Sequence, residues 1–196
     1  LSLKGLNVLI HSLSLVINRI SNAASKVLVL DCDNTLWGGV IGEDGIKGIT
    51  LGQDGIGTAY VDFQKEIINL ANSGVIIVLA SKNNDNDVWD VFDNHTEMKL
   101  KREHIVTSKI NWSEKALNIE EIAEELNLGL NSFVFWDDNP LERDKMRTLL
   151  PQVLTIDVPK EVVHWPRLLR TISNFAKFQI TEDDKKKSDQ YKSRAK

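Results

Sequence analysis

The amino-acid sequence predicts an α/β fold with a mainly parallel central sheet. Short apolar segments alternate along the chain with stretches whose apolar residues recur at helical spacing, the strand–helix alternation of such folds. The first apolar segment, Val27 to Leu30, is an unbroken aliphatic run, which is typical of a strand buried on both faces. Polar residues follow several of these segments directly, at the strand ends where open α/β sheets bind ligands.

The composition fits one compact domain without disulfides. The chain has 196 residues, of which 42% are hydrophobic and 27% charged, enough to bury a sizeable core. Its net charge of −4 argues against nucleic acid as the main partner. The one cysteine, Cys32, cannot form an internal disulfide, so we expect a reducing, cytoplasmic location. No apolar run approaches the roughly 20 residues that span a bilayer, so no membrane is expected as a partner.

The sequence pattern of the first part of the chain predicts a connector helix, a strand, a flap and a second helix. Residues 1–24 have apolar residues at an approximate 3-4 spacing, which indicates an amphipathic helix or connector. The segment Val40–Gly57 is dense in glycine, which excludes a long helix and predicts turns and a small hairpin flap. The apolar face of Thr58–Asn72 predicts a helix.

The second part continues the alternation. Ser81 and Ser113 suit helix caps, Gly129 a helix end and Pro140 a first helical turn. We expect residues 25–178 to form the main domain, with residues 179–196 as a charged tail that links to a further domain. The predicted strands are Val75–Ala80, His104–Thr107, Ser132–Trp136 and Val153–Ile156, and the predicted helices are Asp85–Phe92, a helix capped by Ser113, Leu141–Leu150 and Val162–Phe175.

Polar side chains follow three of the predicted strands. They are Asp31 and Asp33 after the first strand, Ser81 after the second, and Asp137 and Asp138 after Ser132–Trp136. Because parallel strands end at one edge of a sheet, we expect these groups to converge. Several carboxylates within a few ångströms demand a hard cation, and ligands that are all oxygen favour Mg²⁺.

These features also have plainer interpretations. Asp31 and Asp33 could form an acidic turn in which Asn34 and Thr35 cap the backbone. Lys115 lies in the first turn of a predicted helix, where its charge opposes the helix dipole. It is either a solvated lysine or a side chain directed at nearby negative charge.

The ordered set of motifs resembles the signature of the haloacid dehalogenase (HAD) phosphotransferase superfamily. The motifs are Asp31-Cys-Asp33-Asn-Thr35, Ser81, Lys115 and Asp137-Asp138, and the resemblance covers about residues 26–157. The longer segments from Asp31 to Gly45 and from Asp137 to Arg143 resemble the FkbH-like branch. The resemblance implies a HAD-like Rossmannoid three-layer sandwich with a small flap and no large cap domain.

The resemblance also implies roles in phosphoryl transfer. Asp31 would be the nucleophile that forms an aspartyl-phosphate, and Asp33 would be the general acid and then the general base. Ser81 and Lys115 would hold the oxygens of the transferring phosphoryl group. Lys109 is the alternative lysine for this role.

A magnesium site is implied by the same resemblance. Its ligands would be Asp31, the backbone carbonyl of Asp33, and Asp138, while Asp137 orients Lys115. The roles of Asp137 and Asp138 could be exchanged.

Four residues that flank these motifs are candidates for substrate binding. They are Thr35, Trp37, Lys82 and Asn83, of which Trp37 is expected to line the substrate pocket. Cys32 could carry an acyl group, but a side chain between two aspartates should point into the core. Nearby carboxylates would also raise its pKa and make it a poor thiolate.

The function implied by the resemblance is that of an Mg²⁺-dependent phosphatase or phosphotransferase of the FkbH-like kind. Such an enzyme dephosphorylates 1,3-bisphosphoglycerate and loads the glyceryl group on an acyl carrier protein for polyketide extender units. A phosphorylated small molecule and an acyl carrier protein are therefore the expected partners, and the small flap predicts an entrance open to a carrier arm. The alternatives are a general small-molecule phosphatase and a non-catalytic domain that only binds a partner.

Overall fold

The computed structural model describes residues 25–175 and residue 191. In this part of the chain, five strands form one sheet in the order β3-β2-β1-β4-β5, and neighbouring strands are parallel throughout. The predicted α/β class with a mainly parallel sheet is confirmed. The strands are β1 (Val27–Leu30), β2 (Ile76–Ser81), β3 (Ile105–Ile110), β4 (Phe133–Trp136) and β5 (Leu154–Thr155).

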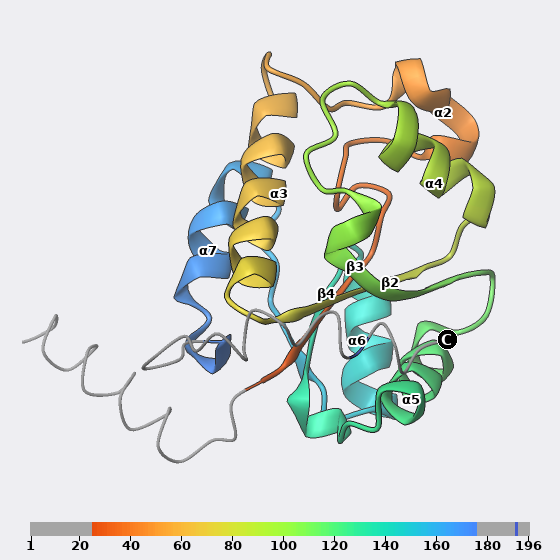
Figure 1. The fold of residues 1–196 in the computed structure, drawn as a ribbon, viewed down its shortest axis with the longest axis vertical. Coiled ribbons are helices and arrows are strands. Elements are labelled where there is room, and N and C mark those ends of the chain that lie inside the picture. The colour runs from red at the N-terminus through yellow and green to blue at the C-terminus, as the bar shows by residue number, and fades with distance from the viewer. Residues whose placement is uncertain (1–24, 176–190, 192–196) are drawn as a thin grey trace, which may run out of the picture.

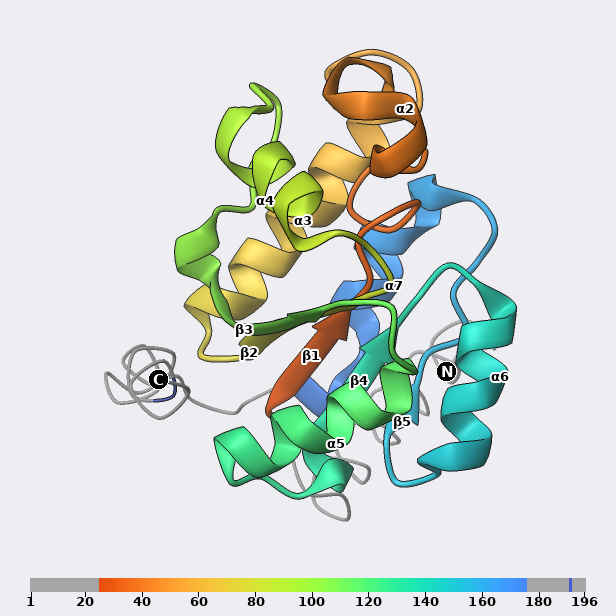
Figure 2. The same cartoon turned by 90° about the vertical axis from the view of Figure 1, so that its right-hand side faces the viewer.

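Helices cover both faces of this sheet. The α-helices of the described residues are α2 (Ile41–Gly48), α3 (Gly57–Asn72), α4 (Asp85–Asn94), α5 (Lys115–Leu126), α6 (Pro140–Leu149) and α7 (Trp165–Thr171). Short 3-10 helices lie at Arg102–His104, Leu130–Ser132, Val162–His164 and Ser173–Phe175. Helices α3 and α7 pack on one face and α5 and α6 on the other, which gives the three layers of the predicted sandwich (Figures 1 and 2).

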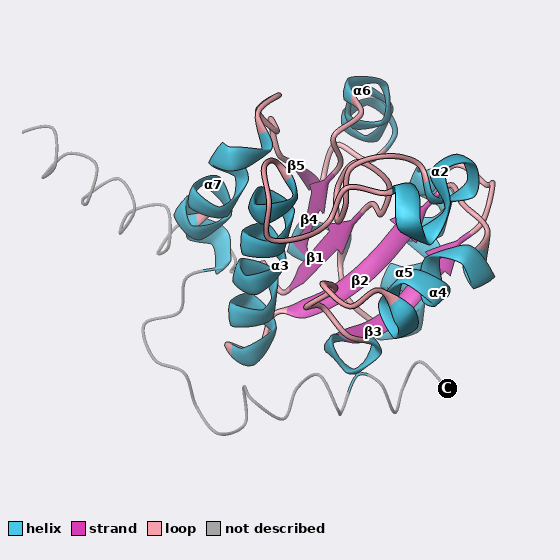
Figure 3. Cartoon of the chain, turned by 90° about the horizontal axis from the view of Figure 1, so that it is seen from above, coloured by secondary structure: helices cyan, strands magenta, loops and turns pink. Residues whose placement is uncertain are grey.

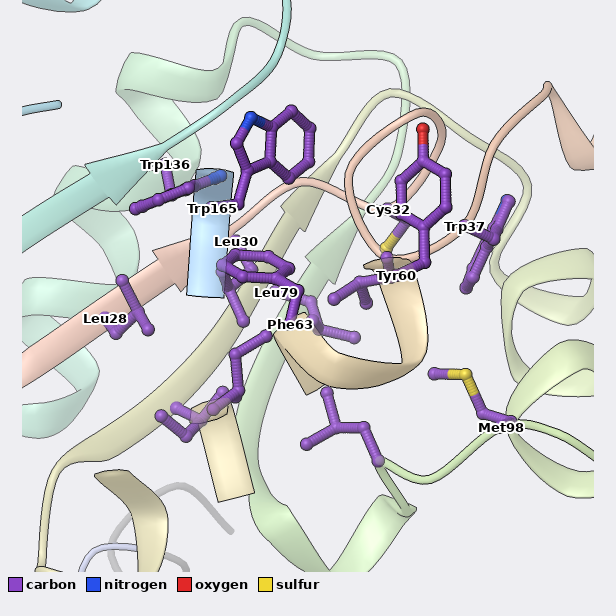
Figure 4. Packing of buried hydrophobic residues seen from close by; sticks show 14 of the residues in the cluster. Leu28, Leu30, Cys32, Trp37, Tyr60, Phe63, Leu79, Met98, Trp136 and Trp165 are labelled. Atoms are coloured by element: carbon purple, nitrogen blue, oxygen red, sulfur yellow. The ribbon is translucent and has the colours of Figure 1, made fainter. Parts of the chain in front are cut away.

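The sheet explains why its central strands are apolar throughout. Leu28 and Leu30 join the core beneath α3 and α7, whereas Val27 and Val29 join the core beneath α5 and α6. Beneath α3, Phe63 lies 4.8 Å from Trp136 and 5.4 Å from Trp165 between ring centroids (Figure 4). These rings anchor α3 and α7 to β4.

The strand order changes direction at β1. From β1 the chain moves outward to β2 and β3, and it then returns to the other side of β1 to form β4 and β5 (Figure 3). Neighbouring loops leave this switch point toward opposite sides, so the carboxyl ends of β1 and β4 border a natural ligand crevice.

The flap after β1 is helical. The predicted hairpin is wrong, because Ile41–Gly48 forms the short helix α2 beyond the carboxyl end of β1 (Figure 2). Gly45 interrupts this helix with a φ of 66°, a left-handed conformation that suits glycine. An antiparallel bridge between Gly38 and Thr50 closes the base of the flap. As predicted, no larger cap domain lies between β1 and α3, a segment that is described in full.

Several predicted helix ends are also corrected. Ser81 ends β2 rather than capping a helix, because Asn84 occupies the N-cap position of α4. Ser113 precedes the N-cap of α5, which is Glu114, and α5 ends at the left-handed Asn127 before Gly129 is reached. The predicted helix Val162–Phe175 is divided into two 3-10 turns and α7. The predicted positions of α3 and of Pro140 in the first turn of α6 are confirmed.

Two predictions concern the ends of the chain, outside the residues that the structure describes. The connector 1–24 and the charged tail 179–196 lie outside the described residues. Within residues 25–175 and residue 191, no helix has the length and apolar character needed to cross a membrane.

Candidate active site

Three carboxylates meet at the carboxyl ends of β1 and β4. These strands pair in register, with Leu30 opposite Trp136, so the residues that follow them lie side by side. As a result, Asp31, Asp137 and Asp138 each place one carboxylate oxygen within 4.8 Å of the others. Asp31 and Asp137 are buried, and Asp138 is half-buried. The structure thus brings together Asp31, Asp137 and Asp138, the acidic side chains of the predicted site.

Lys115 joins this cluster from the first turn of α5. Its Nζ lies 2.9 Å from Asp31 and 2.6 Å from Asp137, and the residue is only 3% exposed. Burial alone would lower the pKa of Lys115, but the Asp31 and Asp137 carboxylates outweigh burial and raise its pKa. The interpretation as a solvated lysine is wrong. The alternative lysine, Lys109, pairs instead with Glu121 at 2.8 Å.

The cluster has more negative than positive charge. Burial and repulsion by Asp31 raise the pKa of Asp137, although Lys115 favours its ionised form. Burial and the same repulsion also raise the pKa of Asp138. Three carboxylates face one lysine, so a cation would relieve the repulsion. An all-oxygen donor set with this excess charge fits a hard divalent metal ion.

Neighbouring groups fix the orientation of the β4 loop. Thr35 Oγ1 donates to Asp138 at 3.1 Å, which joins the β1 loop to the β4 loop. The Arg143 guanidinium donates through Nη1 to the backbone carbonyls of Asp137 at 2.8 Å and Asp138 at 2.7 Å. The backbone N–H of Asn139 donates to the Asp137 side chain at 2.9 Å. These contacts hold both acidic side chains toward β1.

Asp33 lies in a different environment, where its partners are neutral. Its Oδ1 accepts from the Trp37 indole at 2.9 Å and from the Ile41 backbone at 3.0 Å. Its Oδ2 accepts from the Asn83 amide at 2.8 Å. Burial, with a smaller contribution from Asp31, raises the pKa of Asp33 against these hydrogen bonds. A carboxyl group with a raised pKa can act as a proton donor and then as an acceptor.

Two of the predicted substrate-binding residues support Asp33. Trp37 is fully buried, and its ring packs edge-on against Phe92 with the centroids 6.5 Å apart. It therefore does not line a pocket as the sequence suggested, because its indole faces the interior. Asn83 is 4% exposed and orients Asp33 through its amide.

The end of β2 contributes a hydroxyl and a paired cation. Ser81 is 1% exposed at the carboxyl end of β2, next to the Cys32 thiol. Lys82 lies in a network with Glu142, at 3.1 Å, and Glu114, at 3.4 Å. Protein carboxylates thus already neutralise Lys82, which was predicted to bind substrate.

Cys32 is part of the core. It is fully buried among the residues beneath α3 (Figure 4). Burial and the Asp31 carboxylate raise its pKa well above the usual value for a thiol, despite contact with Ser81. This environment opposes its use as an acyl carrier, as expected from its position between two aspartates.

Sequence reasoning missed the positioning roles of Arg143 and the Trp37 indole. Arg143 lies in α6, five residues after Asp138, so a basic residue in the first turns of the next helix was the available signal. Trp37 follows Asp33 by four residues, and its indole reaches the Asp33 carboxylate because the loop between them folds back on itself.

Comparisons with known proteins point to the same kind of site. No protein-family model and no curated protein matches the chain. Among solved structures, the chain is similar to the crystal structure of the N-terminal part of the protein BF1531 from Bacteroides fragilis, described as containing a phosphatase domain complexed with Mg. The two are 40% identical with a TM-score of 0.78, over 82% of this chain and 43% of that chain. This chain therefore spans less than half of that structure's chain.

Proposed function

We propose that this domain is a Mg²⁺-dependent phosphatase of the HAD type. The observation that carries the proposal is that Asp31 belongs to the acidic cluster, whereas Asp33, two residues later, lies among neutral hydrogen-bond donors. Similarity to a magnesium-bound phosphatase domain of BF1531 supports it. The oxygen donors of Asp31, Asp137 and Asp138 would hold the metal ion, which when bound neutralises the phosphate that an anionic nucleophile attacks.

The chemistry uses the two aspartates in turn. An Asp31 carboxylate oxygen attacks phosphorus, and the bond from phosphorus to the leaving oxygen breaks while Asp33 donates its proton to that oxygen. The aspartyl-phosphate is then attacked by water, whose proton passes back to Asp33, and phosphate leaves as Asp31 is restored. Lys115 and Ser81 stabilise the phosphoryl oxygens at both steps. The raised pKa of Asp33 suits this exchange of a proton.

Replacing the nucleophile tests this proposal. Asp31→Asn should lower phosphate release from small phosphomonoesters by at least about 10⁴-fold, because an amide cannot form the acyl-phosphate. The control is Asp62→Asn, which removes an exposed carboxylate of α3 that pairs with Lys65. Phosphate release that survives Asp31→Asn would remove Asp31 as the nucleophile, whereas no phosphate release by the wild-type protein would favour the non-catalytic interpretation.

A finer function follows from the resemblance to the FkbH-like branch. In this proposal, 1,3-bisphosphoglycerate is the substrate and the glyceryl group is loaded on an acyl carrier protein. The short flap α2 supports access for a carrier arm. The burial of Cys32 favours direct transfer to the carrier thiol. Mass spectrometry of a carrier protein incubated with the full-length protein, Mg²⁺ and 1,3-bisphosphoglycerate should show a glyceryl adduct, and an unchanged carrier mass would contradict this function.

A further inference from the structure

A cavity of about 510 Å³ borders the acidic cluster at Asp138. Its walls come from segments far apart in the sequence, including Tyr60 of α3, Arg143 of α6 and Lys160 in the segment before α7. This volume is in the range that binds small molecules. We call it the Lys160 cavity. Because Asp138 lies at its border, a molecule held at the carboxylates could extend into it.

The cations of the Lys160 cavity have no carboxylate partner within residues 25–175 and residue 191. Lys160 is exposed and makes no ion pair there, and Arg143 binds only the carbonyls of Asp137 and Asp138. By contrast, Lys82, which directly follows β2, is paired with Glu114 and Glu142. Two cations whose charge no described carboxylate neutralises, beside one cavity, indicate a site for an anionic group.

A hydroxyl and an apolar wall complete the cavity. Tyr60 is 5% exposed, and its hydroxyl has no hydrogen-bond partner among the described residues. Burial, with the nearby Asp138 carboxylate, raises the pKa of Tyr60 to about 12, so the hydroxyl remains a donor at neutral pH. The Tyr60 ring meets Trp165 edge-on, with centroids 6.0 Å apart, and Val158 and Val162 extend the apolar surface. The cavity therefore offers donors and positive charge beside a wall suited to a short carbon chain.

We propose that the Lys160 cavity binds the remainder of the substrate and selects one that carries a second anionic group, such as a carboxylate. The inference rests on the proposed function for the placement of the phosphoryl group, next to Asp31 and Asp138. It goes beyond that function by assigning to this cavity the selection of a second anionic group over a neutral alcohol. Lys160 and Tyr60 are the specificity-determining contacts.

Binding of two matched compounds tests the proposal. 3-Phosphoglycerate and glycerol 3-phosphate differ by a carboxylate in place of a hydroxymethyl group. Both are titrated by calorimetry into the Asp31→Asn variant with Mg²⁺, in which neither compound is consumed. We expect 3-phosphoglycerate to bind about tenfold more tightly, as one charge-assisted contact predicts. Adding Lys160→Glu should abolish this preference, and adding Tyr60→Phe should reduce it about threefold.

A charge-matched control separates the cavity from the overall charge of the protein. Lys26→Glu makes the same change at an exposed lysine before the amino end of β1 and should leave the preference intact. Equal affinities, binding of neither compound, or a preference that survives Lys160→Glu would overturn the proposal. A carboxylate preference without phosphate release by the wild-type protein would instead refute the proposed phosphatase and leave the cavity assignment standing.

Discussion

Asp31 and Asp33 are two residues apart, yet they lie in opposite electrostatic surroundings. Asp31 belongs to a charged half of the site, with Lys115 and the carboxylates of Asp137 and Asp138. Asp33 belongs to a neutral half, where an indole, a backbone N–H and an amide donate to it. The comparison teaches that identical side chains acquire different tasks from their neighbours. The charged half suits a metal-assisted nucleophile, and the neutral half suits a proton carrier.

The largest effect that separates the two halves is expected at Asp33. Asp33→Asn keeps an acceptor for the Trp37 indole but cannot exchange a proton. We expect phosphate release to fall about 10²- to 10⁴-fold, the usual contribution of a general acid–base group. Mg²⁺ affinity should change little, because the acidic cluster is left intact. A loss of Mg²⁺ binding as large as the loss of activity would contradict the separation of the two halves, because Asp33 would then also serve the metal site.

Removing the lysine of the charged half should affect both activity and stability. Lys115→Met leaves the buried carboxylates of Asp31 and Asp137 without their cation. Without Mg²⁺, we expect the free energy of unfolding to fall by about 3 kcal/mol, as when one partner of a buried ion pair is removed. Phosphate release with Mg²⁺ should fall about 10²-fold or more.

A second lysine provides the control for this variant. Lys109 pairs with Glu121, whose side chain is 60% exposed, so Lys109→Met should change the free energy of unfolding by less than about 1 kcal/mol. Urea denaturation of both variants measures the difference. Equal losses of stability would contradict the burial of charge at Lys115.

A smaller effect is expected when one hydrogen-bond donor to Asp33 is removed from the neutral half. Trp37→Phe retains most of the packing against Phe92 but removes the indole donor to Asp33. We expect kcat to fall about tenfold, with a cost of about 1–2 kcal/mol in stability. The control is Trp89→Phe, which removes an exposed indole bond to Asp85. If kcat is unchanged in Trp37→Phe, then Trp37 is only a packing residue.

Much of the charged half could be predicted from the sequence. The apolar runs predict parallel strands. Residues that directly follow parallel strands lie at the same edge of the sheet, so the sequence predicts that Asp31 and Asp138 meet. Lys115 was recognisable because its charge is unfavourable at a helix start unless carboxylates face it.

The neutral half depends on loop geometry that local patterns do not encode. Asn34 adopts a left-handed φ of 55°, and the chain turns so that Trp37 faces the core instead of the crevice. Glycine density correctly excluded a long helix in the flap, but it could not distinguish a hairpin from the short helix α2. The Lys160 cavity was not predictable, since Tyr60 and Arg143 come together only through tertiary packing.

The central claim is that carboxylates from the ends of β1 and β4 meet around one divalent cation. Calorimetric titration of Mg²⁺ into the wild-type protein and into Asp138→Asn tests this claim most directly. The account predicts one Mg²⁺ per chain, bound at least about tenfold more weakly by the variant. Asp144→Asn, at an exposed carboxylate of α6, should bind as the wild type does. Equal Mg²⁺ affinities of the wild type and Asp138→Asn would contradict the account.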